Sequence, residues 1–89
     1  MDKIKLQIYT PDGNICNEVV SEVTLPGSMG RFTIMVNHAP IISSLEEGTV
    51  TFLSKGKSTQ MSIAEGFVEG KENSVTVYTE SVKHEKATD

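Results

Sequence analysis

The chain has 89 residues with a formal net charge of −4, and 37% of its residues are hydrophobic. This length suffices for one domain but not for two. The acidic balance argues against nucleic-acid binding, which requires a basic face. The single cysteine, Cys16, excludes an internal disulfide and favours a reducing compartment.

Alternating hydrophobicity begins with the first residues of the chain. The segment KIKLQIY, residues 3–9, places Ile4, Leu6 and Ile8 on one face and polar side chains on the other. This period of two predicts a half-buried strand. The following segment TPDGN, residues 10–14, predicts a turn, because proline presets φ and glycine accepts a positive φ.

The same alternation continues through the rest of the chain. Between residues 15 and 25 the hydrophobic side chains keep odd positions and are expected to share one buried face: Ile15, Val19, Val23 and Leu25. PGSMG, residues 26–30, predicts a second turn. Later strands are expected to turn the following side chains inward: Phe32, Ile34, Val36, Val50, Phe52, Met61, Ile63, Val75 and Val77. No window of ten or more residues carries a convincing helical stripe, so the pattern predicts seven to ten short strands in a β-sandwich or barrel.

His38 is the residue that invites a chemical interpretation. Nucleophilic catalysis would need a serine or cysteine beside a base and an orienting carboxylate, and the nearby Ser43, Ser44 and Glu46 form no known motif. A metal site would need at least three ligands, and His84 is a poor second one. We therefore predict no catalytic, cofactor-binding or metal-binding residues, and favour a structural or interface role for His38.

Two longer segments resemble the N-terminal domain of the epsilon subunit of F-type ATP synthases. The first, LPGSMGRFTIMVNHAPIISSLEEGTVTF, has a glycine-bounded loop, a strand, and then His-Ala-Pro followed by two aliphatic residues. The second is MSIAEGFVEGKENSVTVYTESV. The resemblance runs from about Leu6 to Val82. His-Ala-Pro alone is a weak signal, but its spacing to both later groups of glycines makes the match specific.

The resemblance implies an all-β fold, a flattened β-sandwich of about ten mostly antiparallel strands. We expect this domain to cover residues 1–83 and the polar residues 84–89 to form a disordered tail. Many family members continue into a C-terminal helical hairpin that can inhibit ATP hydrolysis. This chain ends where that hairpin would begin, so we expect the hairpin to be absent.

The resemblance also implies a function and two sets of contact residues. The expected function is that of a non-catalytic central-stalk subunit, which couples the gamma subunit to the c-subunit ring of a proton- or sodium-translocating F-type ATP synthase. Residues implied to face the ring are Ser28, Met29, Gly30 and Arg31. Residues implied to face gamma are His38, Ala39, Pro40, Ile41 and Ile42. In many members the position of Arg31 is acidic or polar, so the charge facing the ring is expected to differ here.

The expected location is the cytoplasmic face of the inner (plasma) membrane, peripheral and as part of the complex. Direct membrane insertion is not expected, because the longest apolar runs have two to three residues. An alternative is a stand-alone β-sandwich ligand-binding module, which would need clustered exposed aromatic residues. The aromatic residues here are Tyr9, Tyr78, Phe32, Phe52 and Phe67, and most of them are expected to have core parity. A small enzyme using His38 is the third hypothesis.

Overall fold

The computed structural model describes residues 3–88, apart from the side chains of residues 84–88. The described residues form ten β-strands and no helix. In chain order the strands are β1 (Ile4–Thr10), β2 (Gly13–Val20), β3 (Glu22–Gly27), β4 (Gly30–Met35), β5 (Ile41–Leu45), β6 (Gly48–Ser54), β7 (Lys57–Ile63), β8 (Gly66–Lys71), β9 (Ser74–Thr79) and β10 (Val82–Thr88).

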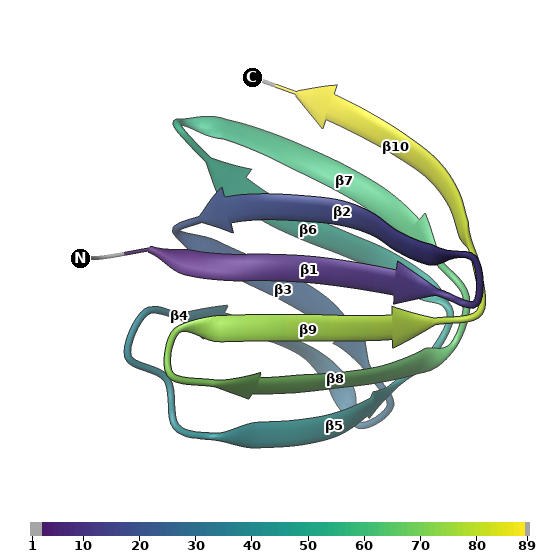
Figure 1. Ribbon diagram of the computed structural model, residues 1–89, viewed down its shortest axis with the longest axis horizontal. Helices are drawn as coiled ribbons and strands as arrows, with labels where there is room; N and C mark the ends of the chain where they lie inside the picture. Colours follow the sequence, from purple (N-terminus) through teal and green to yellow (C-terminus); the bar gives the residue numbers. More distant parts are fainter. Residues whose placement is uncertain (1–2, 89) are drawn as a thin grey trace.

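The strands belong to one hydrogen-bonded sheet that curls over onto itself. Its order is β10-β7-β6-β3-β5-β8-β9-β1-β2, and β4 pairs with β3. The front layer in Figure 1 contains β2, β1, β9, β8 and β5, and the second layer lies behind it. The layers are joined where β3 meets β5 through the single pair Gly27–Leu45. Every pairing is antiparallel except that of β1 with β9. The all-β sandwich expected from the sequence is confirmed.

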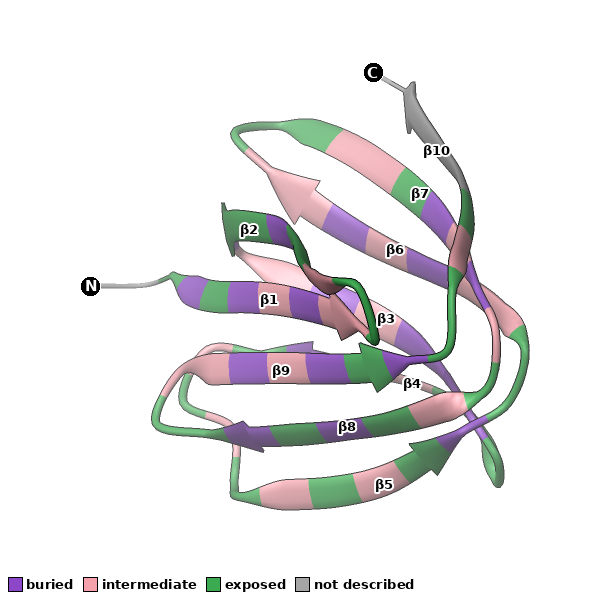
Figure 2. Ribbon diagram, turned by 45° about the vertical axis from the view of Figure 1, so that its right-hand side comes forward, coloured by how far each residue is buried: buried purple, intermediate pink, exposed green. Residues whose placement is uncertain are grey.

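Hydrophobic side chains from both layers fill the space between them. Buried and more exposed residues alternate along strands such as β1 and β9 (Figure 2), as the period of two predicts. Ile4, Leu6 and Ile8 are completely buried, and so are Val75 and Val77. The faces predicted for β1 and β9 are therefore confirmed.

The face predicted for β2 is wrong. Ile15 and Val19 are 43% and 56% exposed, whereas Cys16 and Val20 are buried. The register of β1 and β2 shifts next to the pair Ile8–Cys16, so that Ile15 is an extra, unpaired residue. This bulge puts even-numbered residues of β2 opposite the buried residues of β1. Between residues 15 and 25, odd positions turn inward only in β3, at Val23 and Leu25.

The end of the chain continues the sheet. From residue 84 we expected a disordered polar tail, but the backbone of β10 runs on to Thr88 and pairs antiparallel with β7. The physical reason is that β7 would otherwise present an unpaired edge, whose N–H and C=O groups the backbone of β10 can satisfy. The division into a domain and a tail at residue 83 stays a prediction.

Candidate functional site

The tight turn between β3 and β4 contains two of the residues implied to face a ring, Ser28 and Met29. Gly27 and Gly30 are paired at its base. Gly30 has a φ of +126°, which side-chain-bearing residues rarely adopt. At Gly27 a Cβ would lie 2.6 Å from the carbonyl oxygen of Gly30 and 2.7 Å from the ring of Phe32. The turn therefore requires glycine on both sides.

Hydrogen bonds hold this turn against the neighbouring strands. The backbone N–H of Ser28 donates to the carbonyl of Ser44 at 3.0 Å, and the hydroxyl of Ser44 donates to that of Ser28 at 2.9 Å. The guanidinium of Arg31 donates to the carbonyl of Thr49 at 2.9 Å, so this cation is partly engaged within the domain. Met29 at the tip is fully exposed. The turn is thus a fixed base that presents one apolar side chain to the surroundings.

The segment that carries His38 joins β4 to β5 and is fastened to the β8–β9 turn. Asn37 has a φ of +63° and Asn73 a φ of +60°. The backbone N–H of Asn37 donates to Oδ1 of Asn73, and Nδ2 of Asn73 donates to Oδ1 of Asn37 at 3.3 Å. Two turns far apart in sequence therefore hold each other in place.

The imidazole of His38 is half-buried at this junction. Its Nδ1 lies 2.9 Å from the carbonyl oxygen of Ala39. Because a carbonyl only accepts, this contact favours the tautomer with the proton on Nδ1. Nε2 is buried and has no hydrogen-bond partner among the described residues, which is costly for a polar atom. The ring packs on Gly70, where a Cβ would lie 3.1 Å from Cε1 of His38.

The other residues implied to face gamma follow His38 into β5. Ala39 and Pro40 are exposed. Ile41 is partly buried and packs against the core, whereas Ile42 is 79% exposed. Ile42 pairs with Glu69 of β8. The structure thus separates the two isoleucines: one anchors the segment and the other is available on the outer face of the sheet.

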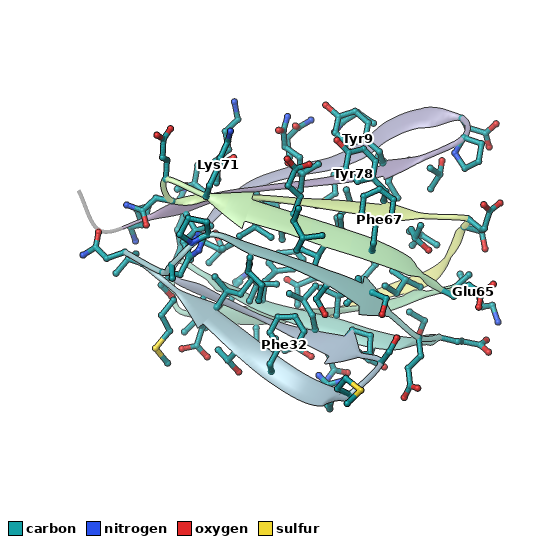
Figure 3. All side chains as sticks on the ribbon, turned by 90° about the horizontal axis from the view of Figure 1, so that it is seen from below. Tyr9, Phe32, Glu65, Phe67, Lys71 and Tyr78 are labelled. Atoms are coloured by element: carbon teal, nitrogen blue, oxygen red, sulfur yellow. The ribbon has the colours of Figure 1, made fainter. Side chains whose placement is uncertain are left out.

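An aromatic row that the sequence analysis missed crosses the same outer face. We define it as Tyr9 of β1, Tyr78 of β9 and Phe67 of β8, which lie side by side in Figure 3. The ring centroids of Tyr9 and Tyr78 are 5.7 Å apart, and those of Phe67 and Tyr78 are 4.9 Å apart. Phe67 is 46% exposed and Tyr78 37%. Exposed rings that stack on one another form a larger apolar surface than scattered ones.

The expectation that most of the five aromatic residues have core parity was wrong, because Tyr9, Phe67 and Tyr78 lie on the outer face. The signal was present in the sequence, because each one alternates with residues that are fully buried: Ile8, Val68 and Val77. A side chain next to an inward-facing one in a strand points outward. Parity alone would therefore have predicted that the three rings face outward, but not that their strands are neighbours.

Among the residues that the structure describes, no helix is long and apolar enough to cross a bilayer. Within the same residues, no group of three or more His, Cys, Asp or Glu side chains could hold a metal ion.

Comparison with known proteins identifies the family. The family described as ATP synthase, Delta/Epsilon chain, beta-sandwich domain matches residues 3–85. The chain belongs to this family, which confirms the resemblance seen in the sequence.

Relatives include the ATP synthase epsilon chain of Desulfitobacterium hafniense, 37% identical over 78 residues that cover 88% of this chain and 59% of the relative. The epsilon chain of Carboxydothermus hydrogenoformans is 36% identical over 88 residues, covering 99% of this chain and 66% of the relative. The chain therefore spans about three-fifths of the length of such relatives.

Solved structures share the fold. A chain of the Euglena gracilis mitochondrial ATP synthase, solved as OSCP/F1/c-ring, has a TM-score of 0.85 at 23% identity, covering 91% of this chain and 52% of its own length. A chain of the central stalk and c-ring of the Tetrahymena thermophila mitochondrial enzyme has a TM-score of 0.75 at 14% identity, covering 91% and 66%. At these identities the likeness establishes the fold alone.

Proposed function

We propose that this chain is a non-catalytic central-stalk subunit of a proton- or sodium-translocating F-type ATP synthase, coupling the gamma subunit to the c-subunit ring. Its place would be peripheral, on the cytoplasmic face of the membrane that holds the ring. Support comes from the family, and from the solved relatives of this fold, whose assemblies are named for the c-ring and the central stalk.

The observation that carries the proposal is that the two proposed docking surfaces lie at opposite ends of β5. The His38 segment enters β5 at Ile41, and the Met29 turn is hydrogen-bonded to Ser44 near the other end. A strand of this length keeps its ends about 13 Å apart. A subunit that joins gamma to the c-subunit ring needs one contact surface for each of them, held at a fixed distance by a rigid strand.

The surface for the ring is the turn of Ser28, Met29, Gly30 and Arg31. Its glycines and hydrogen bonds fix the backbone, so Met29 can insert into an apolar gap without the turn losing further conformational freedom. The surface for gamma comprises His38, Ala39, Pro40, Ile41 and Ile42. Ile42 supplies an apolar centre and the neighbouring polar residues a rim, as in ordinary protein interfaces.

The fold suits the transmission of torque. Nine of the ten strands lie on a single path of hydrogen-bonded neighbours, and β4 pairs with β3. The His38 segment and the Met29 turn are both bonded to this sheet. Force applied at one surface therefore reaches the other through hydrogen bonds and core packing, with no flexible linker between them.

A binding titration against the purified gamma subunit of the same organism tests this function. We expect wild-type chain to bind, His38→Ala to bind gamma at least about tenfold more weakly, and Met29→Ser to bind gamma normally. Met29→Ser should instead weaken association with detergent-solubilised c-ring. Failure of the wild-type chain to bind gamma would contradict the proposal.

A stand-alone ligand-binding module is the second candidate, because the aromatic row supplies the clustered exposed rings that it requires. The same titration separates the two functions. A module of this kind would leave gamma unbound, and substitutions at His38 and Met29 would have no effect on its ligand.

A further inference from the structure

An unpaired carboxylate lies beside the exposed isoleucine of the surface proposed for gamma. Glu69 of β8 is paired directly with Ile42 of β5 in the antiparallel register, so both side chains point to the same outer face with their Cβ atoms about 5 Å apart. Both residues are exposed. Among the residues that the structure describes, no ion pair or hydrogen bond engages the side chain of Glu69. The apolar centre proposed for gamma thus has an uncompensated negative charge at its side.

An open hollow of about 360 Å³ adjoins Glu69 on this face. It is lined by residues of β8, β9 and the turn between them: Glu69, Lys71, Glu72, Ser74, Thr76 and Tyr78. Lys71 lies on the same outer side of the sheet as the aromatic row (Figure 3), and within the described part of the chain it has no ion-pair partner either. Because two carboxylates face one cation, the hollow is polar and carries a net negative charge.

The hollow lies at the His38 end of β8. The imidazole of His38 packs on Gly70, which stands between two of the lining residues in β8. The β8–β9 turn is hydrogen-bonded to the segment before β5 through Asn73 and Asn37. The opposite end of β8 pairs with the end of β5 that is bonded to the Met29 turn. The hollow is therefore continuous with the surface proposed for gamma and distant from the one proposed for the ring.

Docking of gamma on Ile42 would draw Glu69 into the interface. An ionised carboxylate that loses its water without gaining a partner carries a large free-energy cost. Lys71 is two residues further along the same face, about 7 Å along the strand, and it forms no ion pair with Glu69. A favourable interface therefore requires gamma to bring a positive charge to this position.

We propose that the hollow beside Glu69 receives a lysine or arginine side chain of the gamma subunit. The inference rests on the proposed function, because it adds a charged contact to the surface assigned to the same partner. The incoming cation donates hydrogen bonds to the carboxylate of Glu69, and Glu72 adds a second negative charge nearby. Hydroxyl groups of Ser74 and Thr76 can accept its remaining hydrogens. Lys71 repels the same cation, which gives the contact a signature of its own.

The test is a titration of the full chain against purified gamma at two salt concentrations. Glu69→Gln keeps the size of the side chain and removes its charge, and it should weaken binding about tenfold at low salt. The loss should shrink at high salt, because partly exposed charges are screened. Lys71→Gln should bind at least as tightly as wild type. Glu65→Gln is the matched control, because Glu65 is an exposed carboxylate beside the other end of β8, and it should bind within about twofold of wild type.

The outcomes are distinguishable. If wild-type chain binds gamma and His38→Ala weakens it, but Glu69→Gln binds as Glu65→Gln does, the inference about the hollow is overturned and the proposed function stands. An equal loss in Lys71→Gln and Glu69→Gln would make Lys71 the partner of Glu69 and would also overturn the inference. If wild-type chain does not bind gamma, the proposed function falls and the inference with it. Because Glu69 is exposed, Glu69→Gln should fold normally, and its urea midpoint checks this.

Discussion

The imidazole of His38 occupies the space that a side chain on Gly70 would take. A Cβ on Gly70 would lie 3.1 Å from Cε1 of His38 and 3.3 Å from Cγ2 of Ile41. The missing side chain in β8 is therefore what lets the segment before β5 settle onto the sheet. The contact proposed between His38 and gamma thus depends on Gly70, which is not among the residues proposed to contact gamma.

Gly70→Ala is expected to push the imidazole away and to destabilise the fold by about 1 kcal/mol, because overpacking outweighs the entropy gained by replacing glycine. Urea unfolding measures the loss, and the NMR resonance of the His38 Cε1 proton reports the displacement. When Gly70→Ala is combined with His38→Ala, the loss in free energy of unfolding caused by Gly70→Ala should largely vanish, because the imidazole is no longer there to be displaced. An unmoved histidine resonance in Gly70→Ala would show that the contact is loose.

The bonds between Asn37 and Asn73 predict a graded effect at Asn73. Asn73→Gly removes the side chain but tolerates the positive φ, so we expect a loss of about 1 kcal/mol from the hydrogen bonds alone. Asn73→Ala should lose about 1 kcal/mol more, because alanine is strained at this φ. In a domain of this size each step corresponds to about 4–8 °C in Tm. Equal Tm values for the two variants would argue against backbone strain.

Gly66→Ala should be the most damaging glycine substitution. A Cβ there would lie 1.9 Å from the backbone carbonyl oxygen of Tyr78, and only separation of β8 from β9 could relieve the clash. We expect a loss above about 3 kcal/mol or failure to fold, measured by chemical unfolding. Gly56→Ala is the matched control, because no atom lies within 4 Å of its added Cβ. The stability lost in Gly56→Ala should come only from placing alanine at a positive φ.

The ion pair of Lys83 with Glu47 predicts a small dependence of stability on pH. The hydrogen bond from Lys83, and then its charge, lower the pKa of Glu47 from its ordinary value of 4.5. A lowered pKa in the folded state means that the stabilisation is present above about pH 4.5 and is lost as the pH falls through the folded value. Urea midpoints of wild type and Glu47→Gln should converge on acidification at low salt. Both side chains are largely exposed, so salt should reduce the difference.

Much of the fold follows from alternation in the sequence. A period of two identifies β1 and β9 together with their buried faces, because residues such as Leu6 and Val77 can be buried only if the strand turns them inward. The same rule failed in β2, where the bulge at Ile15 reversed the parity. A bulge depends on the pairing partner, and β2 alone carries no sign of it.

The candidate docking surfaces are harder to predict from the sequence than the strands are. Alternation says that Ile41 and Ile42 face opposite ways but not which one is buried, since that depends on the neighbouring strand. The role proposed for the His38 segment rests on family resemblance, because its contacts with Asn73 and Gly70 join residues far apart in the chain. For the aromatic row, parity gives the outward direction of Tyr9, Phe67 and Tyr78, whereas their stacking depends on the pairing of β1, β9 and β8.

The parallel pairing of β1 with β9 has a consequence for biosynthesis. β1 cannot complete its pairing until β9 has also been synthesised, since these two strands are neighbours in the sheet although seven strands separate them in the chain. Until then its apolar side chains lack their final cover and are open to association with other nascent chains. Such long-range closure is slow compared with local folding. Folding of this domain should therefore depend on the time taken to synthesise β1 through β9 and on chaperones that shield β1 in the meantime.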